Sequence, residues 1–289
     1  MKRSLLGLIL IWGFSLPHIC AVVVNPDAAE VSARPYAPLV DQGEHSFQPG
    51  EKMLYHVDWN PPWYLFFLPP MEAGTAELSI SGVLDYQSHQ AVKIMFAAHS
   101  SGTLAKLSGF MIDDYYETFA DPQNFCVYAV TKRERQGKRK RDIEIVYLKE
   151  SRRLHIKDYD VSVSPPLPMK DKYVDEVPAC VQDYFSALYS LRMKTIETGT
   201  IVQSIVGEYE NYKNLEARVE KREWIGTPTG RYDAWRMNVQ ALAGGLFRGG
   251  GQFKVWITAD GRKIPVQFEV KASIGKVTGK LTNYSTPEH

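Results

Sequence analysis

The amino-acid sequence predicts a mainly β protein, built as one large curved antiparallel sheet or open β-barrel with a single packed helix. Three observations predict this fold class. Short runs in which apolar and polar residues alternate recur through most of the chain, and a period of two is typical of strands with one buried face. Glycine and aspartate lie between these runs, where hairpin turns need them. One segment, residues 181–194, lacks the alternation and contains no glycine or proline.

The overall composition indicates an ordered globular protein. Of the 289 residues, 44% are apolar and 23% are charged, which excludes a disordered chain and a small disulfide scaffold. The formal net charge is +1, whereas dedicated nucleic-acid binders carry a clear basic excess. We therefore expect no nucleic-acid partner.

The first 21 residues have the three parts of a secretory signal peptide. A basic start precedes an apolar run at residues 5–16, and Pro17 breaks that run. The run is shorter than the about 20 apolar residues that span a bilayer. We therefore expect export to the periplasm, with cleavage near Ala21. A lipoprotein acylated at Cys20 is the alternative, which is less favoured because the residues before Cys20 are not small.

The rest of the chain divides into a leader and one domain. Residues 22–48 have no clear period, so we expect a loosely structured leader. Strand-like runs then continue to the end, so residues 49–285 are predicted as a single β-rich domain of roughly ten to twelve strands. The clearest runs are residues 76–80, 92–94, 154–156, 159–163, 217–219, 235–239, 253–257 and 266–270.

The exception to the alternation predicts an amphipathic helix at residues 181–194. Tyr184, Leu188 and Leu191 fall at positions i, i+4 and i+7, with Phe185 beside them. This spacing puts them on one helix face. We expect that face to pack on the sheet.

Five motifs in a fixed order resemble the exported bacterial family known as domain of unknown function family 3108. The resemblance covers about residues 45–284 and implies export and a β-rich fold. It implies no catalytic residue, because the activity of that family is undefined. The motif residues are Phe47, Gly50, Glu51, Lys52, Tyr55, Val57 and Trp59; Ala73, Gly74 and Ala76; Asp183 to Leu188, Tyr189 and Arg192; Thr227, Pro228, Gly230 and Tyr232; and Val255, Trp256, Ile257, Asp260, Arg262, Pro265 and Val266.

Residues that could carry catalysis or bind a metal are scattered. No Gly-x-Ser-x-Gly motif and no HExxH-like histidine pair occurs, so we assign no catalytic residue, metal ligand or cofactor. The densest acidic cluster is Asp113, Asp114 and Glu117. Adjacent strand residues point to opposite faces, so Asp113 and Asp114 would not face each other. A non-enzymatic protein is favoured, and a polysaccharide hydrolase acting through Asp114 and Glu117 remains an alternative.

Residues 132–141 form a strongly basic segment, with seven basic side chains and one acid. Strand-like runs flank it, which predicts a hairpin tip. A tip of this kind can simply prevent edge pairing of strands, which is the favoured interpretation. The functional alternative is contact with an anionic envelope polymer or with lipid headgroups. The candidate contact residues are Lys132, Arg133, Arg135, Lys138, Arg139, Lys140 and Arg141.

A proline-bracketed apolar insert occupies residues 61–70. An apolar loop in solvent is an aggregation hazard, so a buried strand is the favoured interpretation. The alternatives are the mouth of a lipid-binding cavity and a loop that touches a membrane. The candidate ligand-binding residues are Trp63, Tyr64, Phe66 and Phe67.

Two cysteines, Cys126 and Cys180, remain after signal cleavage. Export would bring them into an oxidising compartment, where they could pair. Two separate thiols remain an equal alternative, because the sequence does not give the distance between their Cα atoms.

Together these observations predict an exported cell-envelope protein without enzymatic activity, which binds an apolar or amphipathic ligand such as a lipid or glycolipid. The first alternative is an envelope structural or assembly protein that binds a partner protein. The hydrolase is the second. A cavity lined by apolar side chains would favour ligand binding, whereas a filled core with an exposed apolar patch would favour a protein partner.

Overall fold

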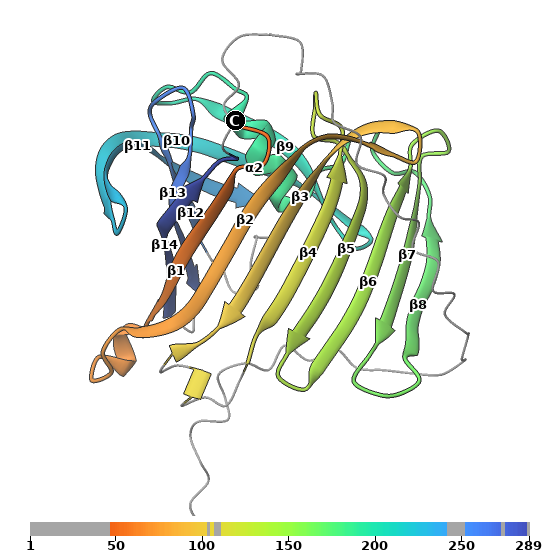
Figure 1. The fold of residues 1–289 in the computed structure, drawn as a ribbon, viewed down its shortest axis with the longest axis horizontal. Helices are drawn as coiled ribbons and strands as arrows, with labels where there is room; N and C mark the ends of the chain where they lie inside the picture. Colours follow the sequence, from red (N-terminus) through yellow and green to blue (C-terminus); the bar gives the residue numbers. More distant parts are fainter. Residues whose placement is uncertain (1–46, 103–104, 107–110, 242–251, 273–274, 288–289) are drawn as a thin grey trace, which may run out of the picture.

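The computed structural model describes residues 47–102, 105–106, 111–241, 252–272 and 275–287. The predicted signal peptide and all but the last two residues of the predicted leader lie outside the described residues. The described residues form one antiparallel sheet of 14 strands that curls without closing (Figure 1). The predicted fold class is confirmed, with more strands than the roughly ten to twelve expected from the alternation pattern.

Each strand pairs with its neighbours in the sequence, except that β8 and β9 form the two open edges of the sheet. The first strand also pairs with the last, so the two ends of the domain meet in the middle of the sheet. The strands are β1 (Lys52–Asn60), β2 (Met71–Tyr86), β3 (His89–Ser100), β4 (Asp113–Ala120), β5 (Val127–Gln136), β6 (Arg139–Leu148), β7 (Arg153–Asp160), β8 (Leu167–Val174), β9 (Ile201–Glu208), β10 (Asn211–Thr227), β11 (Gly230–Ala241), β12 (Gln252–Thr258), β13 (Pro265–Ala272) and β14 (Gly275–Ser285).

The helix α2 (Tyr184–Arg192) lies inside the curve of the sheet (Figure 1). Asp183 caps it, because its carboxylate accepts a hydrogen bond from the backbone N–H of Ser186 at 2.7 Å, and the Ser186 hydroxyl accepts one from the backbone N–H of Asp183 at 2.8 Å. Such a reciprocal cap defines a helix start. The predicted helix is confirmed but shorter at both ends. Leu191 is buried and Phe185 and Leu188 pack on the core as predicted, whereas Tyr184 is 36% exposed and Tyr189 and Arg192 are buried in addition.

The apolar core consists of three clusters on the inner face of the sheet. The largest joins Tyr189 of α2 to inward residues of β1 to β4 and β11 to β14, so the helix holds the two halves of the sheet together. The second cluster lies on β5, β6 and β7 with Val177 and Val181, and the third lies between the end of α2 and β10 to β12. The helix thus packs against part of the concave face.

Side chains connect the two open edges of the sheet. Glu210, in the turn between β9 and β10, pairs with Lys170 and Lys172 of β8. Gln182, just before α2, forms a parallel bridge with Val206 of β9. The strands β8 and β9 are therefore not paired with each other. The ion pairs of Glu210 and the segment around Gln182 connect these two edges instead.

Candidate functional site

The candidate site lies at one end of the sheet, which we call the loop end. It carries the connections β1–β2, β3–β4, β5–β6 and β13–β14 and forms the lower edge of the sheet in Figure 1. The apolar insert and the basic segment both lie there, although about 60 residues of sequence separate them.

The insert forms the loop between β1 and β2, which we call the aromatic loop (residues 61–70). It contains the short 3₁₀ helix η2 (Trp63–Leu65) and projects beyond the sheet (Figure 1). Trp63 and Phe66 are 86% and 85% exposed, and Phe67 and Tyr64 are 66% and 52% exposed. The expectation of a buried strand is therefore wrong. Proline lacks the N–H that a strand ladder needs, so the four prolines end the ladder at both sides and leave a loop.

The basic segment is the hairpin between β5 and β6, as predicted from its flanking strands. Gly137 occupies the turn with a φ of 58°, which glycine adopts without strain. Several of its charges are paired within the protein. Arg135 pairs with Asp142 at 2.6 Å, and Arg139 pairs with Glu134 at 2.9 Å. The charge at this tip is thus partly neutralised, while Lys138 and Lys140 stay exposed.

Two members of the basic segment point into the molecule. The Lys132 ammonium lies 5.5 Å from the ring centre of Tyr116 and 5.7 Å from that of Tyr209, distances at which a cation is attracted to the ring face. Arg141 binds the buried Asp158 with two nitrogens, one of them Nε at 2.8 Å. Burial works against the charge of Arg141, but the hydrogen bonds that Arg141 donates to Asp158 and the negative charge of Asp158 together outweigh burial, so the pKa of Arg141 is raised. These residues support the fold and are poor candidates for contact with a soluble anion. The remaining candidate, Arg133, is exposed on the opposite face, over the ring of Tyr115.

Replacing Asp158 with asparagine should lower the free energy of unfolding by about 2 kcal/mol, because it leaves the Arg141 guanidinium without its carboxylate on the inner face of the sheet. Urea denaturation measures this loss. Asp171→Asn is the matched control, since Asp171 pairs with His155 on the exposed side of β8 and should change stability by less than about 0.5 kcal/mol. Equal losses in the two variants would contradict the assignment.

Two of the motif residues that carry the family resemblance, Glu51 and Arg192, meet at the C-terminal end of α2. Arg192 and Glu51 are fully buried and form a two-nitrogen ion pair, with Arg192 Nη2 3.1 Å from Glu51 Oε2. The Tyr284 hydroxyl also donates to Glu51, and the Tyr55 hydroxyl donates to the backbone oxygen of Pro265 at 2.7 Å. The network joins β1, α2 and the last strands. Its enclosure makes it structural, because no substrate could reach it.

Cys126 and Cys180 form a disulfide with a Cα–Cα distance of 5.0 Å. It connects the start of β5 to the segment that leads into α2. Beside it, the Val127 N–H donates to the backbone oxygen of Val181 at 2.8 Å. The bond therefore fixes the segment that caps the helix.

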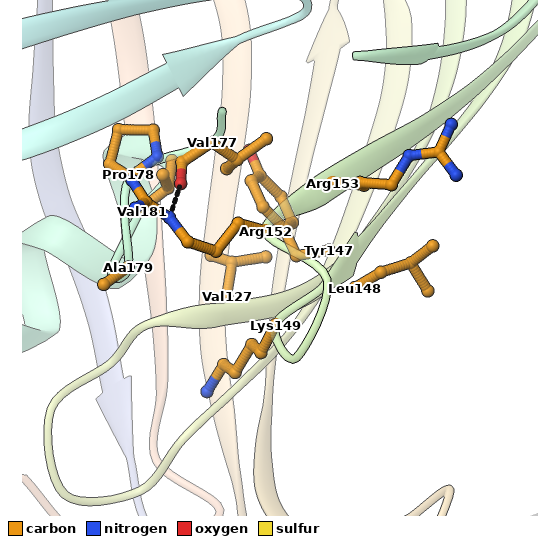
Figure 2. A pocket seen from close by; sticks show the side chains of 10 residues that line it. All are labelled: Val127, Tyr147, Leu148, Lys149, Arg152, Arg153, Val177, Pro178, Ala179 and Val181. Carbon is orange, nitrogen blue, oxygen red and sulfur yellow. Dashed lines mark hydrogen bonds between the residues drawn. The ribbon is translucent and has the colours of Figure 1, made fainter. Parts of the chain in front are cut away.

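A small cavity lies near this disulfide, at the end of the sheet opposite the loop end (Figure 2). Its volume is about 20 Å³, which is room for about one water molecule and far below the about 300 Å³ of a small-ligand site. Arg152 Nε crosses its wall to the backbone oxygen of Val177 at 3.1 Å. The cavity is too small for a lipid. Its lining residues are Val127, Tyr147, Leu148, Lys149, Arg152, Arg153, Val177, Pro178, Ala179 and Val181.

The acidic cluster does not form a facing pair of carboxylates. Asp114 points inward, where it accepts hydrogen bonds from the Arg135 N–H and the Gln136 side chain. Asp113 is exposed and pairs with His99 at 2.7 Å, as strand alternation predicts. Glu117 lies on the same outer face as Asp113. The hydrolase alternative needs two carboxylates across a cleft, and this cluster does not supply them.

Within the described ranges, no cluster of three or more histidine, cysteine or acidic side chains is arranged to hold a metal ion. In the same part of the chain, no helix is both long and apolar enough to cross a membrane.

Sequence reasoning missed the inner charges and the buried ion pair. Asp158 follows the buried Leu154 and Ile156 at the same two-residue spacing in β7. A charged residue at this spacing could have been used to predict a buried carboxylate. Glu51 and Arg192 gave no such signal, because the partners are 141 residues apart.

Comparison with known proteins agrees with the geometry. A family model described as "Protein of unknown function (DUF3108)" matches residues 54–282. A crystal structure of a β-barrel-like protein of domain of unknown function DUF1849 from Brucella abortus is similar, with a TM-score of 0.58 and 10% identity, covering 84% of this chain and 99% of that chain. At that identity the similarity concerns the fold alone. No curated protein matches the chain.

Proposed function

The chain belongs to the protein family of unknown function DUF3108, and from this premise we propose that it is a non-enzymatic protein of the cell envelope that binds an apolar or amphipathic molecule, a lipid or glycolipid, through its aromatic loop. The proposal includes export to the periplasm by the signal peptide at residues 1–21. A disulfide between Cys126 and Cys180 suits that compartment.

The observation that carries the proposal is the exposure of the aromatic loop. Four large aromatic side chains are between 52% and 86% exposed on one short loop. Soluble proteins avoid such patches unless they bind something. Because α2 and the apolar clusters occupy the concave face, we place ligand contact at the loop end rather than inside the sheet.

The test is native mass spectrometry of the protein purified from the periplasm of a Gram-negative host, followed by organic extraction. We expect a reproducible lipid adduct that is lost when Phe66 and Phe67 are both replaced by serine. Trp224→Ser is the control, because Trp224 is 58% exposed in the β10–β11 hairpin, away from the loop end. A ligand-free mass that stays unchanged after incubation with envelope lipid extracts would refute the proposal.

A second candidate is an envelope assembly protein that binds a partner protein. The packing of α2 on the concave face together with the exposed aromatic loop favours it, since that combination suits a surface contact better than an enclosed ligand. Cross-linking in the periplasm tests it. A partner captured by the wild-type protein and lost in the Phe66→Ser, Phe67→Ser variant would support this candidate.

A further inference from the structure

We propose that the loop end is a docking surface for an anionic phospholipid bilayer, with the aromatic loop inserted among the headgroups and exposed lysines contacting lipid phosphates. The inference rests on the proposed function for the class of partner, a lipid. It goes further because it names a membrane surface and fixes the orientation of the protein on it.

The first observation is that the aromatic loop and the basic hairpin belong to one continuous edge. The Ser101 N–H donates to Ala73 O at 3.0 Å, which ties the β3–β4 connection to β2. The Gly137 N–H donates to Met111 O at 2.7 Å, which ties the β5–β6 turn to the same connection. Three strand spacings separate β2 from β5, or about 15 Å. A flat surface can therefore meet both features together.

The second observation is the charge on either side of the aromatic loop. Lys138 and Lys140 are exposed on one side, in the basic hairpin. On the other side, Lys271 and Lys276 lie opposite each other in the strand register of the β13–β14 hairpin. Lys276 forms an ion pair with Glu269, and Lys271 is exposed. Each exposed basic residue near an anionic membrane strengthens binding by about fivefold. Exposed lysines therefore flank the aromatic loop on both sides, where they can contact lipid phosphates.

The third observation is the chemistry of the aromatic loop. Tryptophan and tyrosine concentrate at membrane–water interfaces, because each ring has an apolar body and a polar atom. Trp63 and Tyr64 stand beside Phe66 and Phe67, and prolines at both ends limit the flexibility of the loop. Met111 is also 53% exposed at this end. Such a set inserts into headgroups without a spanning segment.

A bilayer fits these observations better than a protein partner. A stable protein interface buries about 800 Å² on each partner. Among the described residues of the loop end, however, the large exposed apolar side chains belong to the aromatic loop, with Met111 and, in the β7–β8 connection at the same end, Val163 as isolated additions. A bilayer needs only a few apolar side chains and nearby basic residues.

The experiment is co-sedimentation of the purified protein with vesicles of phosphatidylcholine containing 30% phosphatidylglycerol, a composition chosen for the assay, compared with phosphatidylcholine alone. We expect binding to the anionic vesicles. Replacing Phe66 and Phe67 with serine should weaken it at least about tenfold, and replacing Lys138 and Lys140 with glutamine should weaken it about 25-fold. Sodium chloride at 0.5 M, where the Debye length is about 4 Å, should weaken it in the wild type.

Two control variants make changes of the same kind away from the loop end. Trp224→Ser removes an exposed aromatic side chain at the opposite end of the sheet, and Lys157→Gln with Lys194→Gln removes two positive charges from β7 and from the segment after α2. Both should bind vesicles as the wild type does. Near-UV circular dichroism checks that every variant is folded.

The possible outcomes separate this inference from the proposed function. No vesicle binding by the wild type would overturn the inference, even where native mass spectrometry detects a bound lipid. Binding that needs Lys138 and Lys140 but not Phe66 and Phe67 would also overturn it, because the aromatic loop would then play no part in docking. Vesicle binding that is lost both in the phenylalanine variant and in the lysine variant supports the inference. If such binding occurs while no lipid co-purifies with the protein, the inference stands and the proposed capture of a lipid molecule is refuted.

Discussion

Replacing Arg192 with methionine is expected to lower the free energy of unfolding by about 3–5 kcal/mol, the usual consequence of removing one partner from a buried ion pair. Both side chains are fully buried, so Glu51 would lose its counter-charge where water cannot replace it. The loss would also free the end of α2, because Arg192 donates to the backbone oxygen of Arg262 at 3.1 Å. Urea denaturation followed by circular dichroism measures the change.

The control for this prediction is Arg218→Met, which breaks an exposed pair. Arg218 bonds Glu216 at 2.8 Å and its side chain is 56% exposed, so the loss should stay below about 1 kcal/mol. A double variant, Glu51→Met with Arg192→Met, addresses the risk that the single variant does not fold. Because it leaves no buried charge unpaired, it should be more stable than Arg192→Met alone. A double variant that is less stable than the single one would show that Glu51 stabilises the fold even without its counter-charge, contrary to this account.

The sequence was sufficient to predict the strands and the helix because their signals are local. In β7, the alternation of Leu154, Ile156 and Asp158 is visible within a few residues, and in α2 the spacing of Leu188 and Leu191 is equally local. The length of each strand was less predictable. Partly exposed residues extend β2 and β10 beyond their alternating runs, and the pattern there carries no period.

The candidate site was harder to predict, because exposure and pairing depend on the whole fold. Residues 63–68 have the composition of a core strand, and only the turn between β1 and β2 places them in solvent. Likewise, the basic segment looked uniform in the sequence. Whether a given cation faces Asp158 or the solvent depends on the register between β6 and β7. Non-local pairing of this kind leaves no periodic trace in one sequence.

Reduction of the disulfide between Cys126 and Cys180 is expected to lower the free energy of unfolding by about 4 kcal/mol. The bond closes a loop with a sequence separation of 54 residues, and the entropy that such a loop removes from the unfolded chain corresponds to about 4 kcal/mol at 25 °C. The loop contains β5 to β8, so without the bond the unfolded chain gains freedom over four strands. Urea denaturation with and without dithiothreitol measures the difference.

Cys180→Ser is the sharper test, because the two cysteines differ in burial. Cys126 is 4% exposed whereas Cys180 is exposed, so Cys126→Ala would leave a cavity and Cys180→Ser should remove little besides the cross-link. We therefore expect Cys180→Ser to match the reduced wild type in stability, and dithiothreitol to leave this variant unchanged. A loss below about 1 kcal/mol in both would mean that contacts such as the Val127–Val181 hydrogen bond already restrict the chain before it folds. The helix cap at Asp183, which follows the bridged segment, would then depend on those contacts rather than on the bond.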